Sequence, residues 1–118
     1  MQFFLSAGFI ILGLCGLIFL FAGIVQIKFP PKKINLLYGY RTSSSMRSQE
    51  AWDFAQKYSA KVSIWVGVIM IIFGLIFLLL PNISNDYQVW FSLLIIFTLV
   101  AFLIISTEIK LKRKFGKK

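Results

Sequence analysis

The chain has 118 residues, of which 58% are hydrophobic and 14% are charged, and its mean hydropathy is +0.83. These values exclude an ordinary soluble domain and indicate an integral membrane protein. Thirteen Lys and Arg against four Asp and Glu give a net charge of +9, which in so apolar a chain indicates membrane orientation and anionic lipid rather than nucleic acid. The chain has no His, so we expect no metal site and no cofactor.

Three apolar segments are long enough to cross a bilayer, whose core of roughly 30 Å needs about 20 helical residues. They cover residues 3–27, 62–80 and 89–107. Pro30 and Pro31 prevent the first helix from continuing, and Pro81 ends the second before a short loop. The fold class expected is therefore an all-α membrane domain with three spans, a long loop over 28–61 and a basic tail over 108–118.

The positive charges predict how these spans are oriented, because Lys and Arg near span ends are retained in the cytoplasm. All thirteen lie in the long loop or in the tail, and none lies before the first span or between the second and third. We therefore expect the N-terminus outside and the loop and the C-terminus in the cytoplasm.

Glycines in the first two spans predict how those spans pack. Gly16 and Gly23 are seven residues apart, as are Gly67 and Gly74, so each pair lies on one helical face and allows close approach. The alternative is that Gly is simply frequent in membrane helices. The spans contain no Asp, Glu, Lys or Arg, which argues against a transporter or a proton channel built from this chain alone.

The loop contains a predicted amphipathic helix that Ser45 or Ser48 would cap. It either bends near Tyr58 to lie in the membrane plane or continues as one helix into the second span. At 100° per residue, one face carries Ala51, Ala55, Tyr58 and Val62, flanked by Trp52 and Phe54, and the opposite face carries Gln49, Glu50, Asp53, Gln56, Lys57 and Ala60.

Ahead of this helix, Gly39 predicts a turn and Arg41 offers a planar guanidinium to a phosphate or carboxylate. The alternatives are that Arg41 caps a helix or pairs with Glu50 or Asp53, and that Trp52 is only an interfacial anchor. The candidate partner- or ligand-binding residues are Tyr38, Gly39, Tyr40, Arg41, Thr42, Ser45, Met46, Glu50, Trp52, Asp53 and Phe54.

Residues 38 to about 105 resemble the SdpI family of bacterial membrane proteins, in particular its short members. The resemblance rests on Gly39, the pair Arg41 and Thr42, the pair Ser45 and Met46, and Trp52 with Ala55. It implies a bacterial cell-membrane protein. The best-known member of the family protects its producer from a secreted peptide toxin and signals by holding a transcriptional repressor at the membrane. The resemblance implies a similar role for this chain.

Two functions from different classes follow from these observations. The first is toxin immunity or signal transduction through recruitment of a cytoplasmic partner. The second is a small membrane adaptor that binds anionic lipid or protein, as a single chain or a homo-oligomer. A lipid-modifying enzyme ranks behind both, because Glu50 and Asp53 have the positions of solvated helix charges and no nucleophile or metal triad accompanies them.

Overall fold

The computed structural model describes residues 6–34, 39–80 and 82–115, and these form helices without any strand. The four helices are α1 (Ala7–Lys28), α2 (Ser43–Met46), α3 (Gln49–Leu79) and α4 (Asn85–Phe115). α1, α3 and α4 are each long and apolar enough to cross a membrane. The prediction of an all-helical protein with three such helices is therefore confirmed.

The predicted helix before the second span is not a separate element. Its residues are the first turns of α3, which runs without a break for 31 residues from its cap at Ser48, whose hydroxyl accepts from the Ala51 amide. Of the two alternatives, the continuous helix holds. The predicted polar face is also wrong in part, because Gln56 and Ala60 are buried. Other parts of the chain cover more of this half of the helix than its apolar stripe, although Glu50, Asp53 and Lys57 remain exposed.

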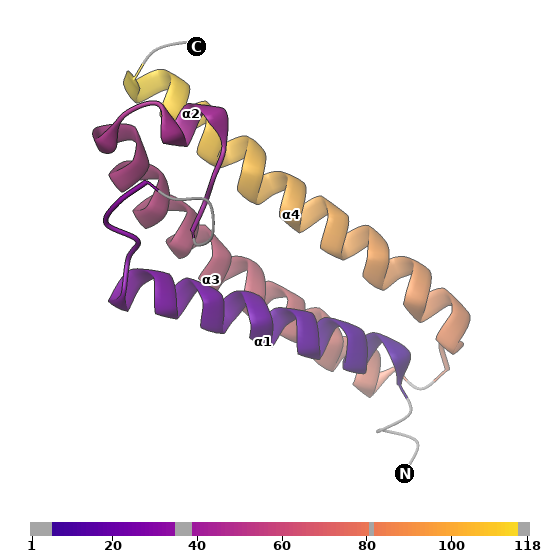
Figure 1. Ribbon diagram of the computed structural model, residues 1–118. Coiled ribbons are helices and arrows are strands. Elements are labelled where there is room, and N and C mark those ends of the chain that lie inside the picture. The colour runs from indigo at the N-terminus through magenta and orange to yellow at the C-terminus, as the bar shows by residue number, and fades with distance from the viewer. Residues whose placement is uncertain (1–5, 35–38, 81, 116–118) are drawn as a thin grey trace.

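α1 and α3 pack closely through the predicted glycine faces (Figure 1). A methyl group at Gly16 would lie 2.7 Å from the Gly67 carbonyl oxygen, and one at Gly23 would lie 2.7 Å from the Ala60 carbonyl oxygen. The two backbones are therefore as near as glycine allows, which confirms the predicted packing. The Ser63 hydroxyl adds a hydrogen bond of 2.8 Å to the Phe19 carbonyl across this interface.

α4 covers one face of this pair and is fastened at its N-terminal end to the start of α1. The Gln88 side-chain oxygen accepts from the Ser6 hydroxyl at 2.7 Å and from the Gly8 amide at 2.8 Å. The Asn85 side-chain oxygen accepts from the Ala7 amide at 3.1 Å. Amide groups of α4 thus satisfy the free N–H groups that begin α1, next to the Ser6 cap.

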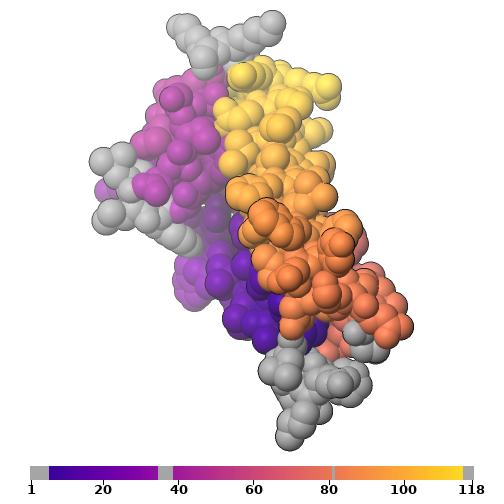
Figure 2. Space-filling view, turned by 90° about the vertical axis from the view of Figure 1, so that its right-hand side faces the viewer, coloured from indigo at the N-terminus to yellow at the C-terminus, as the bar shows by residue number. Residues whose placement is uncertain are grey.

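The long loop and the C-terminal turns of α4 meet at the opposite end of the bundle (Figure 1). Figure 2 shows α4 along the face of the molecule, with the loop segment beside its last turns. We call this end, formed by residues 28–34, 39–61 and 104–115, the basic end, because the Lys and Arg residues in the described part of the chain belong to it. The predicted tail is helical as far as Phe115, since α4 continues to that residue.

Candidate functional site

The basic end is organised around Gln56, whose side chain is 2% exposed. Its amide oxygen accepts from the Tyr40 N–H at 2.7 Å, and its amide nitrogen donates to the Tyr40 carbonyl at 2.8 Å. Gln56 therefore pairs with the loop backbone as a neighbouring strand would. The Gln26 side chain at the end of α1 donates to the same Gln56 oxygen at 3.0 Å and to the Ser59 hydroxyl at 3.1 Å.

Gly39 makes this pairing possible. Its φ of +100° lies in the region that favours glycine, so the backbone uses the conformational freedom predicted for this position. A methyl group at Gly39 would also lie 2.5 Å from the Gln56 side-chain oxygen. Any side chain here would strain the backbone and displace the hydrogen bonds that Gln56 makes.

A second centre is Glu108, one residue beyond the predicted third span. One of its carboxylate oxygens accepts from the Tyr40 hydroxyl and from the Thr42 hydroxyl, both at 2.7 Å. These short hydrogen bonds to a charged group are of the strong kind. They join the loop to α4 across more than 60 residues of sequence.

The pKa values of this cluster reflect these contacts. Burial and then the hydrogen bond and charge of Glu108 raise the pKa of the Tyr40 hydroxyl. Burial alone would raise the pKa of the Glu108 carboxyl, but hydrogen bonds from Tyr40, Thr42 and Ser44, with the charge of Lys112, bring it below the ordinary value. Tyr40 is therefore a neutral donor and Glu108 an ionised acceptor at neutral pH.

The short helix α2 positions Thr42. The Thr42 hydroxyl accepts from the Ser45 amide at 3.2 Å, and the Thr42 amide donates to the Ser45 hydroxyl at 2.8 Å, which is a capping box. The Ser45 hydroxyl also lies 3.2 Å from the Tyr40 carbonyl oxygen, to which it can donate. Ser45, fully buried, thus fixes the chain between Tyr40 and Met46.

Trp52 fastens the segment that follows α1. Its ring is fully buried, and its indole N–H donates to the Pro31 carbonyl at 2.5 Å. The Gln49 side chain donates to the neighbouring Lys32 carbonyl at 2.5 Å. Trp52 is therefore packed inside the protein, and the interpretation of Trp52 as an interfacial anchor is wrong.

Apolar packing completes the attachment of α4 to the loop. Ala51, Ala55 and Leu111 form a buried cluster, against which Tyr40, Phe54 and Phe115 pack. The Arg47 guanidinium donates to the Phe115 carbonyl. The predicted basic tail is thus part of the folded structure at least as far as Phe115.

The candidate residues divide into three groups. Ser45 and Trp52 are buried in the basic end, while Gly39, Tyr40, Thr42, Met46 and Phe54 are half-buried. Arg41, Glu50 and Asp53 are exposed, and the Asp53 carboxylate accepts from the Gln49 side chain at 2.8 Å. Tyr38 lies outside the described residues.

Sequence reasoning missed Gln26, Gln56, Glu108 and Leu111. Helical periodicity puts Gln56 on the face opposite the apolar stripe, and the sequence pattern puts Glu108 in the basic tail. One signal for Glu108 was available, because it is the one acidic residue in a C-terminal segment with six cations. The described residues contain no group of His, Cys, Asp or Glu that could hold a metal ion.

Comparison with known proteins supports the resemblance found in the loop. The model of the SdpI/YfhL protein family matches residues 32–107. The chain belongs to the SdpI/YfhL family. It is 35% identical over 96 residues to a Bacillus subtilis (strain 168) protein named "Uncharacterized protein YfhL", covering 81% of this chain and 83% of that protein. No solved structure matches the chain.

The matched region begins in the loop and ends one residue before Glu108. It includes Gly39, Tyr40, Thr42 and Gln56, and leaves out the whole of α1. The family match is thus centred on the folded loop, α3 and the membrane part of α4.

Proposed function

We propose that this SdpI/YfhL-family protein acts in peptide-toxin immunity or signalling by holding a soluble cytoplasmic partner at the bacterial cell membrane. The observation that carries the proposal is that the loop is folded against α3 and α4 rather than merely joining two spans. Gln56 and Glu108 together fix both the backbone and the hydroxyl of Tyr40. A surface organised in advance loses less entropy when a partner binds.

The proposed orientation places the N-terminus outside and the basic end in the cytoplasm, because positive charge near span ends is retained there. The predicted spans, residues 3–27, 62–80 and 89–107, carry no Asp, Glu, Lys or Arg, so they provide no charged route through the bilayer. The proposed role is therefore one of binding at the basic end rather than of transport through the bilayer.

Arg41 is the residue of this surface best placed to touch a partner. Its neighbours Tyr40 and Thr42 are both held by Glu108, while the Arg41 side chain is exposed. The backbone that bears the guanidinium is thus fixed, and the guanidinium itself faces outward. A planar fork of donors on a fixed support suits a carboxylate or phosphate of the partner.

The test is survival of a sensitive strain that expresses the protein and is exposed to candidate membrane-active peptides. Wild type is expected to raise survival, and Arg41→Lys, which keeps the charge but loses the fork, to abolish the gain at equal abundance in the membrane. Arg113→Lys is the matched control, since Arg113 is also exposed at the basic end. Protection by Arg41→Lys equal to wild type would contradict the assigned role of Arg41, and absence of protection by wild type would contradict immunity.

The exposed cations of α4 support a second candidate, a membrane adaptor that binds anionic lipid. Lys110, Lys112, Arg113 and Lys114 are exposed on the last turns of α4, and each charge near an anionic surface contributes about 1 kcal/mol. Removing the tail would also remove Leu111 from the core, so substitution is the cleaner test. Changing Lys110, Lys112 and Arg113 to Gln should weaken binding to phosphatidylglycerol vesicles if lipid is the ligand, and unchanged binding at low salt would exclude it.

A further inference from the structure

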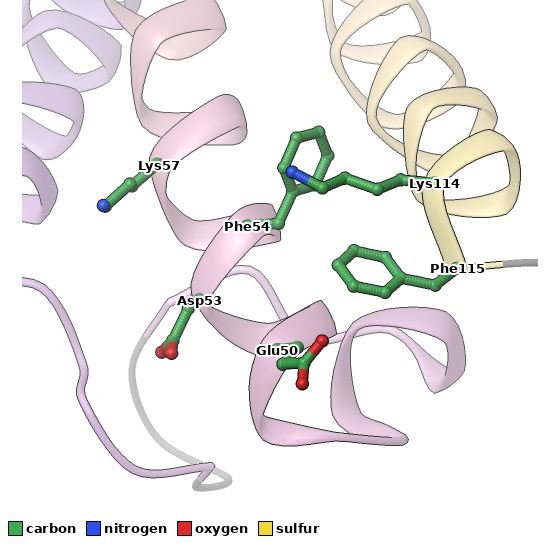
Figure 3. Close-up of a pocket in the computed structure, with 6 residues that line it drawn as sticks. All are labelled: Glu50, Asp53, Phe54, Lys57, Lys114 and Phe115. Carbon is green, nitrogen blue, oxygen red and sulfur yellow. The ribbon is translucent and has the colours of Figure 1, made fainter.

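A shallow depression of about 340 Å³ lies where the first turns of α3 meet the last turn of α4 (Figure 3). Figure 3 shows Lys114 reaching over the Phe54 ring, with Phe115 beside it and Glu50 at the foot of the same depression. Asp53 and Lys57 stand farther round α3. The lining residues are Glu50, Asp53, Phe54, Lys57, Lys114 and Phe115.

The aromatic floor of this depression is fixed in place. The Phe54 and Phe115 rings meet edge to face, with centroids 5.9 Å apart at 67°, and Phe54 also stacks on Tyr58 at 5.8 Å. Both phenylalanines pack on the buried cluster of Ala51, Ala55 and Leu111. The rings therefore present a defined surface.

This surface already holds a cation. The Lys114 ammonium lies 4.7 Å from the centroid of Phe54 and 5.9 Å from that of Phe115, within the range of a cation–π contact. Lys114 thus shows that these two rings can hold a cation. Lys114 itself is exposed on the last turn of α4.

The distance from the bilayer argues for a soluble occupant. Phe54 precedes Val62, where the predicted second span begins, by eight residues of continuous helix, or about 12 Å. Lys114 follows Thr107, where the third span ends, by seven residues, or about 10 Å. The headgroup layer adds only roughly 5–8 Å on each side of the hydrocarbon, so the depression lies beyond it.

The distribution of acidic residues indicates that the occupant of the depression is cationic. Of the four acidic residues in the chain, Glu108 is engaged by Tyr40 and Thr42, and Asp86 lies at the other end of the bundle. The remaining two, Glu50 and Asp53, both line the depression. The rest of the basic end repels a cationic group, and among the described residues this depression is where carboxylates and aromatic rings come together.

We propose that this depression binds an arginine or lysine side chain of a soluble protein, displacing Lys114 from the rings, while an acidic neighbour of that side chain pairs with Lys57. Glu50 and Asp53 balance the incoming charge, and Phe54 and Phe115 pack on its apolar stem. The inference rests on the proposed function, because it names where the partner binds.

The probe is a short capped peptide, Gly-Glu-Arg-Glu-Gly, titrated into the full chain in phosphatidylcholine nanodiscs with ¹³C-labelled phenylalanine. The matched peptide carries Gln in place of Arg and is therefore more negative. General attraction to a chain of charge +9 favours the Gln peptide, whereas the proposed site favours the Arg peptide. We expect the Arg peptide to shift the Phe54 and Phe115 resonances and to bind about fivefold more tightly.

Variants test the residues assigned to the site. Lys114→Met should tighten Arg-peptide binding severalfold, because no resident cation remains to be displaced, while Lys110→Met removes the same charge and should leave the preference for Arg unchanged. The double variant Glu50→Gln with Asp53→Asn should bring the Arg peptide to the affinity of the Gln peptide. Equal or tighter binding of the Gln peptide to wild type would overturn the inference, as would an unchanged affinity in Lys114→Met.

Three further outcomes separate this inference from a lipid-binding site and from the proposed function. If phosphatidylethanolamine shifts the same two resonances and the Arg peptide does not compete, a lipid headgroup is the occupant and the inference is wrong. If Arg41→Lys abolishes protection but the peptides show no preference, only the inference fails. If the peptides behave as expected but expression protects against no toxin, the immunity role alone fails.

Discussion

The two halves of α3 are held in the protein by different chemistry. Toward Leu79, α3 meets α1 through glycines, and the two backbones touch at Gly16 and Gly67. Toward Gln49, it meets the loop and α4 through side chains that donate and accept hydrogen bonds, with Gln56 and Trp52 at the centre. One continuous helix thus belongs to two kinds of interface.

The surroundings of each half explain the difference. Lipid tails are as apolar as leucine, so helices in a bilayer gain little from burying apolar side chains and associate instead through close packing of small residues. At the basic end, the alternative to burial is exposure to water. Burial of Trp52 and Leu111 therefore stabilises the fold, and buried polar groups need hydrogen-bond partners within the protein. In the most apolar stretch of α4, 6% of residues are buried against 33% in α3, so α4 depends more than α3 on its two ends for attachment.

The difference between the two halves of α3 requires that the basic end lie in water, on the cytoplasmic side. A topology assay tests this orientation and has the largest expected effect. An alkaline phosphatase fusion after Lys118 should be inactive, and a fusion at Asn85 should be active, because the enzyme folds only outside the cytoplasm. The opposite pattern would place the basic end outside and remove the basis for a cytoplasmic partner.

Trp52→Ala should cause the largest loss of stability. It removes a fully buried ring and its hydrogen bond to Pro31, which corresponds to about 3–5 kcal/mol of the free energy of unfolding. Trp65, which is 65% exposed on the same helix, is the matched control, and its change to Ala should cost less than about 1 kcal/mol. Thermal unfolding in detergent, followed by circular dichroism, measures both, and equal losses would mean that Trp52 is not enclosed.

Gly16→Ala tests the glycine interface. The added methyl group would lie 2.7 Å from both the Gly67 carbonyl oxygen and the Ile71 side chain, so the helices must separate, at about 1–3 kcal/mol. At Gly13 a methyl group meets no atom within 4 Å, so Gly13→Ala should be neutral or slightly stabilising. The same unfolding measurement applies, and two variants with matching stability would show that α1 and α3 are not in backbone contact.

Glu108→Gln should loosen the loop with a smaller effect, about 1–2 kcal/mol, because the carboxylate is only partly buried. The reason is the loss of charge from two hydrogen bonds of 2.7 Å. Faster hydrogen exchange at the amides of Tyr40 and Ser45 would report it, while Glu50→Gln, at an exposed site, should leave exchange unchanged. Identical exchange in both variants would remove Glu108 from the attachment of the loop.

Acidification should produce a related change in the wild type. The folded pKa of Glu108 lies below the unfolded value near 4.5, so the stability that this carboxylate contributes is complete above that value. It is lost as the pH falls through the lower folded pKa. The Glu108→Gln variant should lack this component, which exchange measured as a function of pH can resolve.

The sequence alone was sufficient for features that depend on composition and local pattern. Apolar runs bounded by proline predicted three spans, the seven-residue spacing of Gly16 and Gly23 predicted a helix contact, and Gly39 predicted a conformational freedom that the backbone uses. Each depends on neighbours within a few residues. The family resemblance likewise rested on short motifs in the loop, and it was confirmed.

Only the tertiary structure decided which side chains are functional neighbours. Glu108 meets Thr42 across 66 residues, and Gln26 meets Gln56 across 30. Helical periodicity places Gln56 on a polar face, but it does not reveal that the loop returns to cover that face. Periodicity reports the character of a helix surface, whereas burial depends on which distant segment packs against it, and that choice is made by the fold as a whole.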